Sequence, residues 1–220
     1  MNPSERHQTT LTPNETAPVA ELISSLCATI PDYPKPGIVF KDLTPVFADG
    51  AALKAVVNAL VEPFKGQFDA VAGVEARGFL LAAAAAYATG TGVITVRKAG
   101  KLPREVVSED YALEYGNATL ELHTTDLAPG SRVLILDDVL ATGGTLGAAV
   151  RLFERCGVEV AGVGVVLELD ELGGRSALGG NRVSSLLRLE SRLRPRPAAG
   201  TSPHEIMDDS VCLGRMPAKN

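Results

Sequence analysis

Cysteine, histidine and aromatic residues are scarce in this chain, and their scarcity excludes several kinds of site. Three cysteines and three histidines occur in 220 residues, and aromatic residues make up 5% of the chain. Cys27, Cys156 and Cys212 are far apart and form no CxxC pair, which argues against a zinc site and a disulfide framework. The histidines are scattered too, so neither a metal cluster nor a catalytic triad is indicated. We therefore expect reduced thiols and a cytoplasmic protein.

The chain also lacks an excess of positive charge and a long apolar run. Its formal net charge is -5, which argues against a broad nucleic-acid-binding face and requires a local basic pocket for any anionic ligand. The longest run of small apolar residues, FLLAAAAAYA at 79–88, has about half the length of a membrane-spanning helix. The first residues have neither the basic start nor the apolar core of a secretory signal. We expect no nucleic-acid partner, no membrane segment and no export.

The sequence does contain an alternation of apolar strands and helices within one domain-sized chain. Continuous Val, Ile and Leu in the strands predicts a mainly parallel sheet covered by helices on both faces, a doubly wound α/β architecture. We predict strands at 68–74, 92–98, 119–123, 132–138, 159–169 and 183–189, and helices at 51–64, 76–90 and 145–157. Residues 1–16 are expected to be a flexible N-terminus and 191–220 a flexible C-terminal tail, with the domain at 17–190.

The segments between these elements are predicted from turn residues and periodicity. A helical pattern runs from Val19 to Ile30 and ends before Pro31. PDYPKPGIVFKDLTPVFAD, at 31–49, contains four prolines and one glycine, which predicts an ordered loop. The charged, glycine-containing segment from Ala99 to about Gly116 predicts a mobile lid.

One segment at the carboxyl end of a predicted strand has the features of a phosphate-binding loop. Ligands of doubly wound sheets bind outside the carboxyl ends of the strands, where this chain carries GVEARGF (73–79), RKAGKLPRE (97–105) and DDVLATGGT (137–145). In DDVLATGGT, backbone N–H groups converge at a helix start, glycines permit close approach, and Thr142 and Thr145 add hydroxyl donors. The same residues also fit an ordinary helix start with Thr caps.

Asp137 and Asp138 precede this loop and would repel a phosphate. Carboxylates at a strand end can chelate magnesium, accept a phosphoryl group or lie solvated in a turn. They can also accept hydrogen bonds from a sugar diol, as an acidic residue does for ribose in dinucleotide-binding folds. A ribose 5-phosphate unit would satisfy both the carboxylates and the loop.

VLILDDVLATGGT, at 133–145, resembles the signature of the type I phosphoribosyltransferases. Four further segments are similar, in order, to the adenine-specific branch of that family, and the resemblance runs from about residue 20 to about residue 190. These segments are PDYPKPGIVFKDLTPVF, GVEARGF, VRKAGKLP and YALEYG. The resemblance implies the type I phosphoribosyltransferase fold, a central mainly parallel sheet with helices on both faces plus a small hood and lid region.

The resemblance also implies the residues that bind the donor, phosphoribosyl pyrophosphate. The acidic pair Asp137 and Asp138 would bind the ribose hydroxyls. The loop that would bind the 5-phosphate consists of Ala141, Thr142, Gly143, Gly144 and Thr145. GVEARGF corresponds to the pyrophosphate loop of the family, which often contains a cis peptide bond, here at Glu75–Ala76. The cations expected at the pyrophosphate are Arg77, Arg97, Lys98 and Lys101, and Arg77 is also expected to serve catalysis through its bidentate guanidinium.

The acceptor base has its own expected residues. The family places the purine between an aromatic ring and an apolar side chain, here Phe40 and Val139, while backbone groups at Val39 and Lys41 would read its edge. Glu114, in YALEYG, corresponds to the glutamate that faces the base and is expected to act as acid/base catalyst. From the residues alone, Phe40 also fits an ordinary core position, Glu114 an exposed hairpin, and the cations a solvated surface.

The function that the resemblance implies is transfer of the phosphoribosyl group to adenine, which gives AMP and pyrophosphate in purine salvage. Mg²⁺ is expected to bind mainly through the substrate pyrophosphate, without dedicated protein ligands. The resemblance further implies a cytoplasmic homodimer. The alternatives are a phosphoribosyltransferase for hypoxanthine, guanine or xanthine, and a regulator that senses the donor without catalysis. A regulator would need a DNA-binding module, for which the residues before Val19 are too few.

Overall fold

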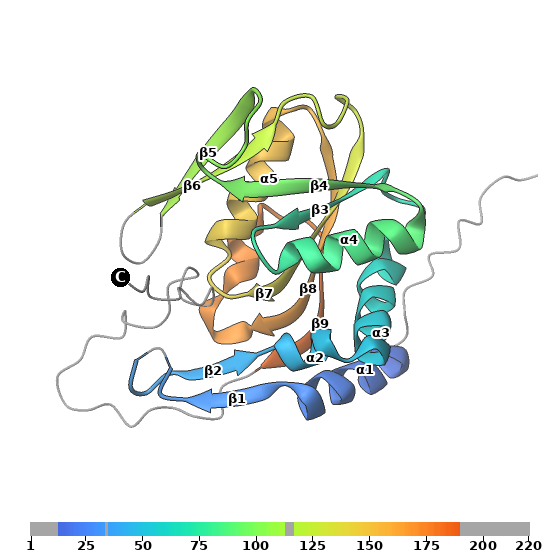
Figure 1. The fold of residues 1–220 in the computed structure, drawn as a ribbon, viewed down its shortest axis with the longest axis vertical. Coiled ribbons are helices and arrows are strands. Elements are labelled where there is room, and N and C mark those ends of the chain that lie inside the picture. Colours follow the sequence, from blue (N-terminus) through green and yellow to red (C-terminus); the bar gives the residue numbers. More distant parts are fainter. Residues whose placement is uncertain (1–12, 34, 113–116, 190–220) are drawn as a thin grey trace, which may run out of the picture.

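The computed structural model describes residues 13–33, 35–112 and 117–189 (Figure 1). The elements in chain order are α1 (Pro13–Leu26), β1 (Ala28–Pro31), β2 (Val39–Asp42), α2 (Thr44–Ala48), α3 (Gly50–Val61), η1 (Glu62–Phe64), β3 (Ala70–Val74), α4 (Gly78–Thr89), β4 (Gly92–Lys98), β5 (Val106–Ala112), β6 (Asn117–His123), β7 (Arg132–Leu140), α5 (Gly144–Arg155), β8 (Glu159–Leu169), η2 (Asp170–Leu172), η3 (Gly174–Leu178) and β9 (Val183–Leu189). The helix α1 begins inside the segment 1–16, and the expected C-terminal tail 191–220 lies outside the described residues.

A seven-stranded sheet in the order β5-β6-β4-β3-β7-β8-β9 forms the centre of the molecule. Its neighbours from β4 through β3, β7 and β8 to β9 are parallel, whereas β6 pairs antiparallel with both β4 and β5. The strands β1 and β2 form a separate antiparallel hairpin, which lies at the opposite end of the molecule from β5 and β6 (Figure 1). The expected mainly parallel sheet is confirmed.

Two apolar cores lie on the two faces of the sheet, because successive side chains of a strand point to opposite faces. In β7, Val133 and Ile135 belong to the core that contains α5, whereas Leu134 and Leu136 belong to the core that contains α3 and α4. Buried helix faces on both sides explain why the strands read as continuous apolar runs. The sheet is therefore shielded on both faces, and the carboxyl ends of its parallel strands remain for ligand binding.

Three of the local predictions were wrong. The helical pattern predicted from Val19 to Ile30 ends early, because Ala28–Pro31 forms β1, which pairs with β2 from Ala28↔Asp42 to Pro31↔Val39. The loop predicted at 31–49 contains β2 and the short helix α2. The segment 99–116 is not one continuous loop, since Val106–Ala112 forms β5 against β6. For β1, β2 and β5, a partner strand supplies hydrogen bonds that the local sequence does not reveal. Within the described residues no helix is long and apolar enough to span a membrane.

Candidate active site

A cavity opens at the carboxyl ends of β3 and β7, where these neighbouring strands lead into the helices α4 and α5. The residues that line it are Glu75, Arg77, Asp137, Asp138, Val139, Leu140, Ala141, Gly143, Thr145 and Leu146. Seven of the residues predicted from sequence are among them: Arg77, Asp137, Asp138, Val139, Ala141, Gly143 and Thr145. The fold thus brings the expected acidic pair, one expected cation and the expected phosphate loop into one cavity.

The acidic pair lies near the end of β7, where Asp138 is buried and Asp137 is half-buried. Asp138 is 6% exposed, and its backbone N–H donates to Asp137 Oδ1 at 2.9 Å. Burial raises the pKa of Asp137 well above its ordinary value, and the adjacent charge of Asp138 adds to the rise. Burial also raises the pKa of Asp138, which Arg77 partly offsets. Two crowded carboxylates of this kind favour a ligand that supplies hydroxyl donors or positive charge.

Arg77 lies at the start of α4 and faces Asp138. Its Nε is 2.7 Å from Asp138 Oδ2, close enough for an ion pair although the two atoms are not aligned as a hydrogen bond. The side chains are 16% and 8% exposed, respectively, so a mostly dry environment strengthens their attraction. The Glu75–Ala76 peptide bond that precedes Arg77 is cis, as the family resemblance implies.

The loop between β7 and α5 has the geometry of an anion cradle. Gly143 caps α5 with φ 81°, a left-handed conformation that favours glycine, and α5 then begins at Gly144. The first turn of α5 contains no acidic residue, and the first N–H groups of a helix lack intrahelical acceptors, so they attract an anion. Thr145 lies in this first turn and lines the cavity. A phosphate group fits the chemistry of this loop.

Glu75 is a residue of this site that the sequence analysis missed. Its carboxylate accepts from Arg97 Nε at 3.3 Å and from the backbone N–H of Lys98 at 3.1 Å, and it forms an ion pair with Lys101. Burial alone would raise the pKa of Glu75, but the contacts with Lys101, Lys98 and Arg97 lower it overall. Glu75 thus connects the loop after β3 to the cations at the end of β4 and just after it.

Comparison with known proteins identifies the family. Residues 45–177 match the family model of the phosphoribosyl transferase domain. A curated relative from Arthrobacter sp. (strain FB24), an adenine phosphoribosyltransferase, is 82% identical over 189 residues, which make up 86% of this chain and 100% of that protein. The chain belongs to the adenine phosphoribosyltransferase family.

Solved adenine phosphoribosyltransferases share this fold. The enzyme from Rhodothermus marinus is 44% identical with a TM-score of 0.74, over 79% of this chain and 99% of that chain. The enzyme from Saccharomyces cerevisiae is 37% identical with a TM-score of 0.74, over 78% and 99% of the two chains. It was crystallised with adenine and D-2,5-dideoxy-2,5-imino-altritol 1,6-bisphosphate. These matches confirm the expected type I phosphoribosyltransferase fold.

Three of the expected base-binding residues, Val39, Phe40 and Lys41, lie on β2 and are not among the residues that line the cavity, whereas Val139 is. Phe40 is buried, with 8% exposed, and its ring packs edge-on against Tyr33 with the centroids 5.2 Å apart. Val39 is 41% exposed, and Lys41 Nζ donates to Thr29 Oγ1 at 2.6 Å.

The remaining predicted residues are placed as follows. Thr142 and Gly144 belong to the loop and the start of α5 but are not among the residues that line the cavity. Arg97 and Lys98 end β4, and Lys101 follows it, so all three lie beside Glu75. Glu114 lies outside the described residues, so its proximity to a base is not tested.

Proposed function

We propose that the protein transfers the 5-phosphoribosyl group from phosphoribosyl pyrophosphate to adenine, which gives AMP and pyrophosphate. This proposal rests on one observation: Asp137 and the buried Asp138 line the same cavity as the anion cradle. Adenine as the acceptor is supported by the 82% identity to an adenine phosphoribosyltransferase and by the adenine bound to the yeast enzyme.

In this function each half of the cavity binds one part of the donor. Asp137 and Asp138 accept hydrogen bonds from the ribose hydroxyls, which relieves the repulsion between two buried carboxylates. The N–H groups of the loop at 141–145 and the hydroxyls of Thr142 and Thr145 bind the 5-phosphate. Because the ribose hydroxyls and the 5-phosphate are both bound, the anomeric carbon is held in a fixed position. The transfer then takes place between groups that are already aligned.

Departure of pyrophosphate requires neutralisation of its charge. We assign this role to Arg77, Arg97, Lys98 and Lys101, whose charges are poised near the carboxyl ends of β3 and β4. Glu75 holds Arg97 and Lys101, and pyrophosphate oxygens would replace its carboxylate when the donor binds. An Mg²⁺ ion would be held mainly by the pyrophosphate oxygens of phosphoribosyl pyrophosphate and by water, and it would add positive charge at the leaving group.

On the acceptor side of the reaction, the purine must be held in position, and a side chain must accept or donate a proton at its ring. We propose that Phe40 and Val139 stack on the purine and that backbone groups at Val39 and Lys41 read its edge. Glu114 is proposed as the acid/base group at the purine ring, and exclusion of water protects the activated ribosyl centre from hydrolysis.

A homodimer is proposed on the basis of α4. Leu80 and Tyr87 on this helix are 55% and 92% exposed, and Val93 at the start of β4 is 46% exposed. The helix sequence, GFLLAAAAAYAT, contains no charged residue, whereas a helix that is apolar on all sides is normally covered. A second copy of this chain is the proposed cover. We further propose residues 17–190 as the catalytic domain and the cytoplasm as its location.

The donor assignment is tested by steady-state kinetics with adenine, phosphoribosyl pyrophosphate and Mg²⁺. Wild type should release AMP and pyrophosphate in equal amounts, and the double variant Asp137→Asn/Asp138→Asn should raise the donor KM by about ten-fold or more because two hydroxyl acceptors are weakened. Glu114→Gln should lower kcat by roughly 10²-fold with little change in either KM. An unchanged donor KM in the double variant would refute the ribose assignment.

A further inference from the structure

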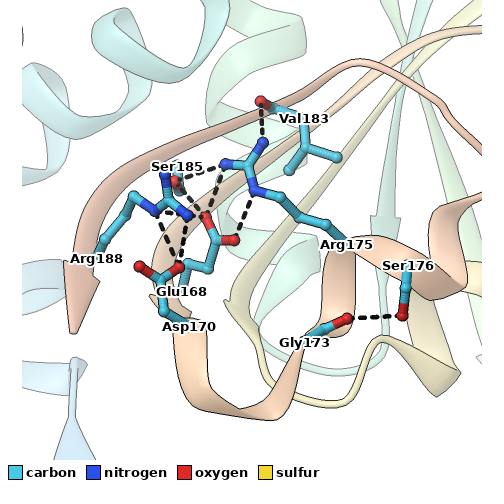
Figure 2. A network of polar contacts seen from close by, with 8 residues as sticks. All are labelled: Glu168, Asp170, Gly173, Arg175, Ser176, Val183, Ser185 and Arg188. Carbon is cyan, nitrogen blue, oxygen red and sulfur yellow. Dashed lines mark hydrogen bonds and ion pairs between the residues drawn. The ribbon is translucent and has the colours of Figure 1, made fainter. Parts of the chain in front are cut away.

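A network of polar and charged groups joins η3 to the carboxyl end of β8 and to β9, and none of its members lines the cavity (Figure 2). Its centre is Glu168, which is 3% exposed. Arg175 donates to both carboxylate oxygens of Glu168, from Nε at 2.6 Å and from Nη2 at 2.8 Å. Ser185 Oγ donates to Glu168 Oε2 at 2.6 Å, and Arg188 Nε lies 3.5 Å from the same oxygen. The burial and the bidentate geometry make Glu168–Arg175 the strongest pair of the network.

Arg175 belongs to η3, whereas the residues that accept hydrogen bonds from its guanidinium belong to strands (Figure 2). Besides Glu168 on β8, the guanidinium donates to the carbonyl of Val183 and to Ser185 Oγ on β9, each at 3.2 Å. The side chain of Arg175 thus fastens the short helix η3 to the edge of the sheet. A 3-10 helix of five residues has little stability of its own, so these contacts and the buried side chain of Leu178 hold it in place.

The other side of η3 packs directly against the phosphate cradle. A Cβ added to Gly174 would meet the carbonyl oxygen of Ala141 and would lie 3.1 Å from the backbone nitrogen of Gly143. A Cβ added to Gly143 would in turn meet the carbonyl oxygen of Gly174, and one added to Gly147 in α5 would lie 2.6 Å from the carbonyl oxygen of Ala177. The loop and the first turns of α5 therefore rest on the backbone of η3, with no space for a side chain between them.

We infer that Arg175 and Glu168 are positioning residues for donor binding, which act by holding η3 behind the loop that binds the 5-phosphate. Neither side chain needs to touch the substrate. The register of β8 and β7 supports this linkage, because Glu168 pairs with Leu140, and Leu140 is followed by Ala141 at the start of the loop. The inference rests on the proposed function, in which this loop binds the phosphate.

Loss of the Arg175–Glu168 pair should weaken the binding only of ligands that carry the 5-phosphate. When η3 is released, the loop loses the surface on which it rests, and a displacement of the binding groups by about 1 Å can cost up to roughly 10²-fold. Phosphoribosyl pyrophosphate and AMP both carry the 5-phosphate and should bind more weakly. Pyrophosphate, which is assigned to Arg77 and the cations after β4, should bind as before. A merely structural role would weaken all three ligands or would lower only the amount of folded protein.

The test compares Arg175→Ala with the matched control Arg188→Ala. Both substitutions remove a guanidinium from Glu168, but Arg188 belongs to β9 and not to η3. For Arg175→Ala we expect the donor KM and the Kd of AMP to rise by about ten-fold or more, with the Kd of pyrophosphate changed less than about two-fold. Arg188→Ala should leave all three constants within about two-fold of wild type.

If Arg175→Ala is insoluble, Arg175→Lys takes its place, since an ammonium group keeps the charge but loses the bidentate contact. It should show the same selectivity with a smaller amplitude. Unchanged donor and AMP constants in the soluble Arg175 variant would overturn the inference, as would an equal loss for pyrophosphate. If wild type and Arg188→Ala form no AMP from adenine and the donor, the proposed function fails instead, so the two failures are distinguishable.

Discussion

Folding shifts the pKa values of two carboxylates that line the same cavity in opposite directions. Burial raises the pKa of Asp137 well above its ordinary value, and the neighbouring charge of Asp138 adds to this rise. Burial also acts on Glu75, but the hydrogen bonds from Lys101 and Lys98 outweigh it and lower the pKa of Glu75 overall. The charged form of Asp137 therefore opposes folding, whereas the charged form of Glu75 stabilises the fold.

For Asp137→Asn we expect a higher melting temperature of the ligand-free protein at neutral pH. The pKa of Asp137 is higher in the folded chain than in the unfolded chain, so its contribution to stability is complete below about pH 4 and is lost as the pH rises through the folded-state pKa. The variant does not suffer this loss. Its advantage in melting temperature over wild type, measured by differential scanning calorimetry across the pH range, should grow from acid to neutral pH.

Glu75→Gln is a control for which we expect the opposite change in melting temperature. The pKa of Glu75 is lowered on folding, so its contribution to stability is present above its ordinary pKa and disappears as the pH falls through the lowered value. The variant should melt below wild type at neutral pH and approach it in acid. If Asp137→Asn melts at or below wild type at neutral pH, the description of Asp137 as an electrostatic cost is wrong.

Single residues could be predicted from sequence only where a motif marks them. Asp137, Asp138, Gly143 and Thr145 form part of one continuous signature, and the structure brings them into one cavity. Glu75 is one of 26 acidic residues in the chain, and its partners Arg97 and Lys101 follow it by 22 and 26 positions. Nothing in the local sequence joins these groups. The parallel pairing of β3 with β4 does so, because it places the ends of the two strands side by side.

Some secondary-structure elements could likewise be predicted from the local sequence, whereas others depend on partners far away in the chain. The strands β4, β8 and β9 have the predicted bounds, 92–98, 159–169 and 183–189, because apolar and β-branched residues favour strands wherever they are placed in the sheet. The strand β5, with the sequence VVSEDYA, was missed because half of it is polar. Its ladder with β6 and the ion pairs of Glu109 with Arg151 and Arg155 on α5 hold it in place.

Gly143→Ala tests whether the position of the phosphate loop depends on its contact with η3. The substitution places a side chain at φ 81° and against the carbonyl oxygen of Gly174, so we expect a loss of stability of about 1–3 kcal/mol and a rise in the donor KM. Gly90→Ala is the matched control, because Gly90 has φ 69° but nothing within 4 Å of the added Cβ. Gly90→Ala should lose about 1 kcal/mol without a change in the donor KM. An equal donor KM in both variants, from the same kinetic assay, would show that the contact with η3 does not position the loop.

At the scale of the whole molecule, the apolar face of α4 predicts the oligomeric state. Tyr87→Asp and Leu80→Asp place charges at the centre of the proposed contact, where burial of an unpaired carboxylate is costly. We expect multi-angle light scattering to give the mass of two chains for wild type and of one chain for the double variant. Gln67→Asp adds the same charge to an exposed position elsewhere and should leave the dimer intact. A wild-type protein with the mass of one chain would contradict the proposed contact.

The donor and the acceptor have separate binding elements in the proposed function. There the carboxyl ends of β3 and β7 and the start of α5 bind the donor, and the hairpin of β1 and β2 supplies residues for the acceptor. A family signature marks the first role in sequence. The second combines Phe40 on β2 with Val139 on β7, which are far apart in the sequence.

A competition among acceptors tests the central claim most directly. Limiting phosphoribosyl pyrophosphate is supplied with Mg²⁺ and equal concentrations of adenine, hypoxanthine and guanine, and the nucleotides formed are identified by mass spectrometry. We expect AMP to exceed IMP and GMP by at least about 10²-fold, because backbone groups that read the edge of adenine leave polar groups unpaired with the other purines. Comparable amounts of IMP or GMP, or donor hydrolysis without any nucleotide, would contradict the account.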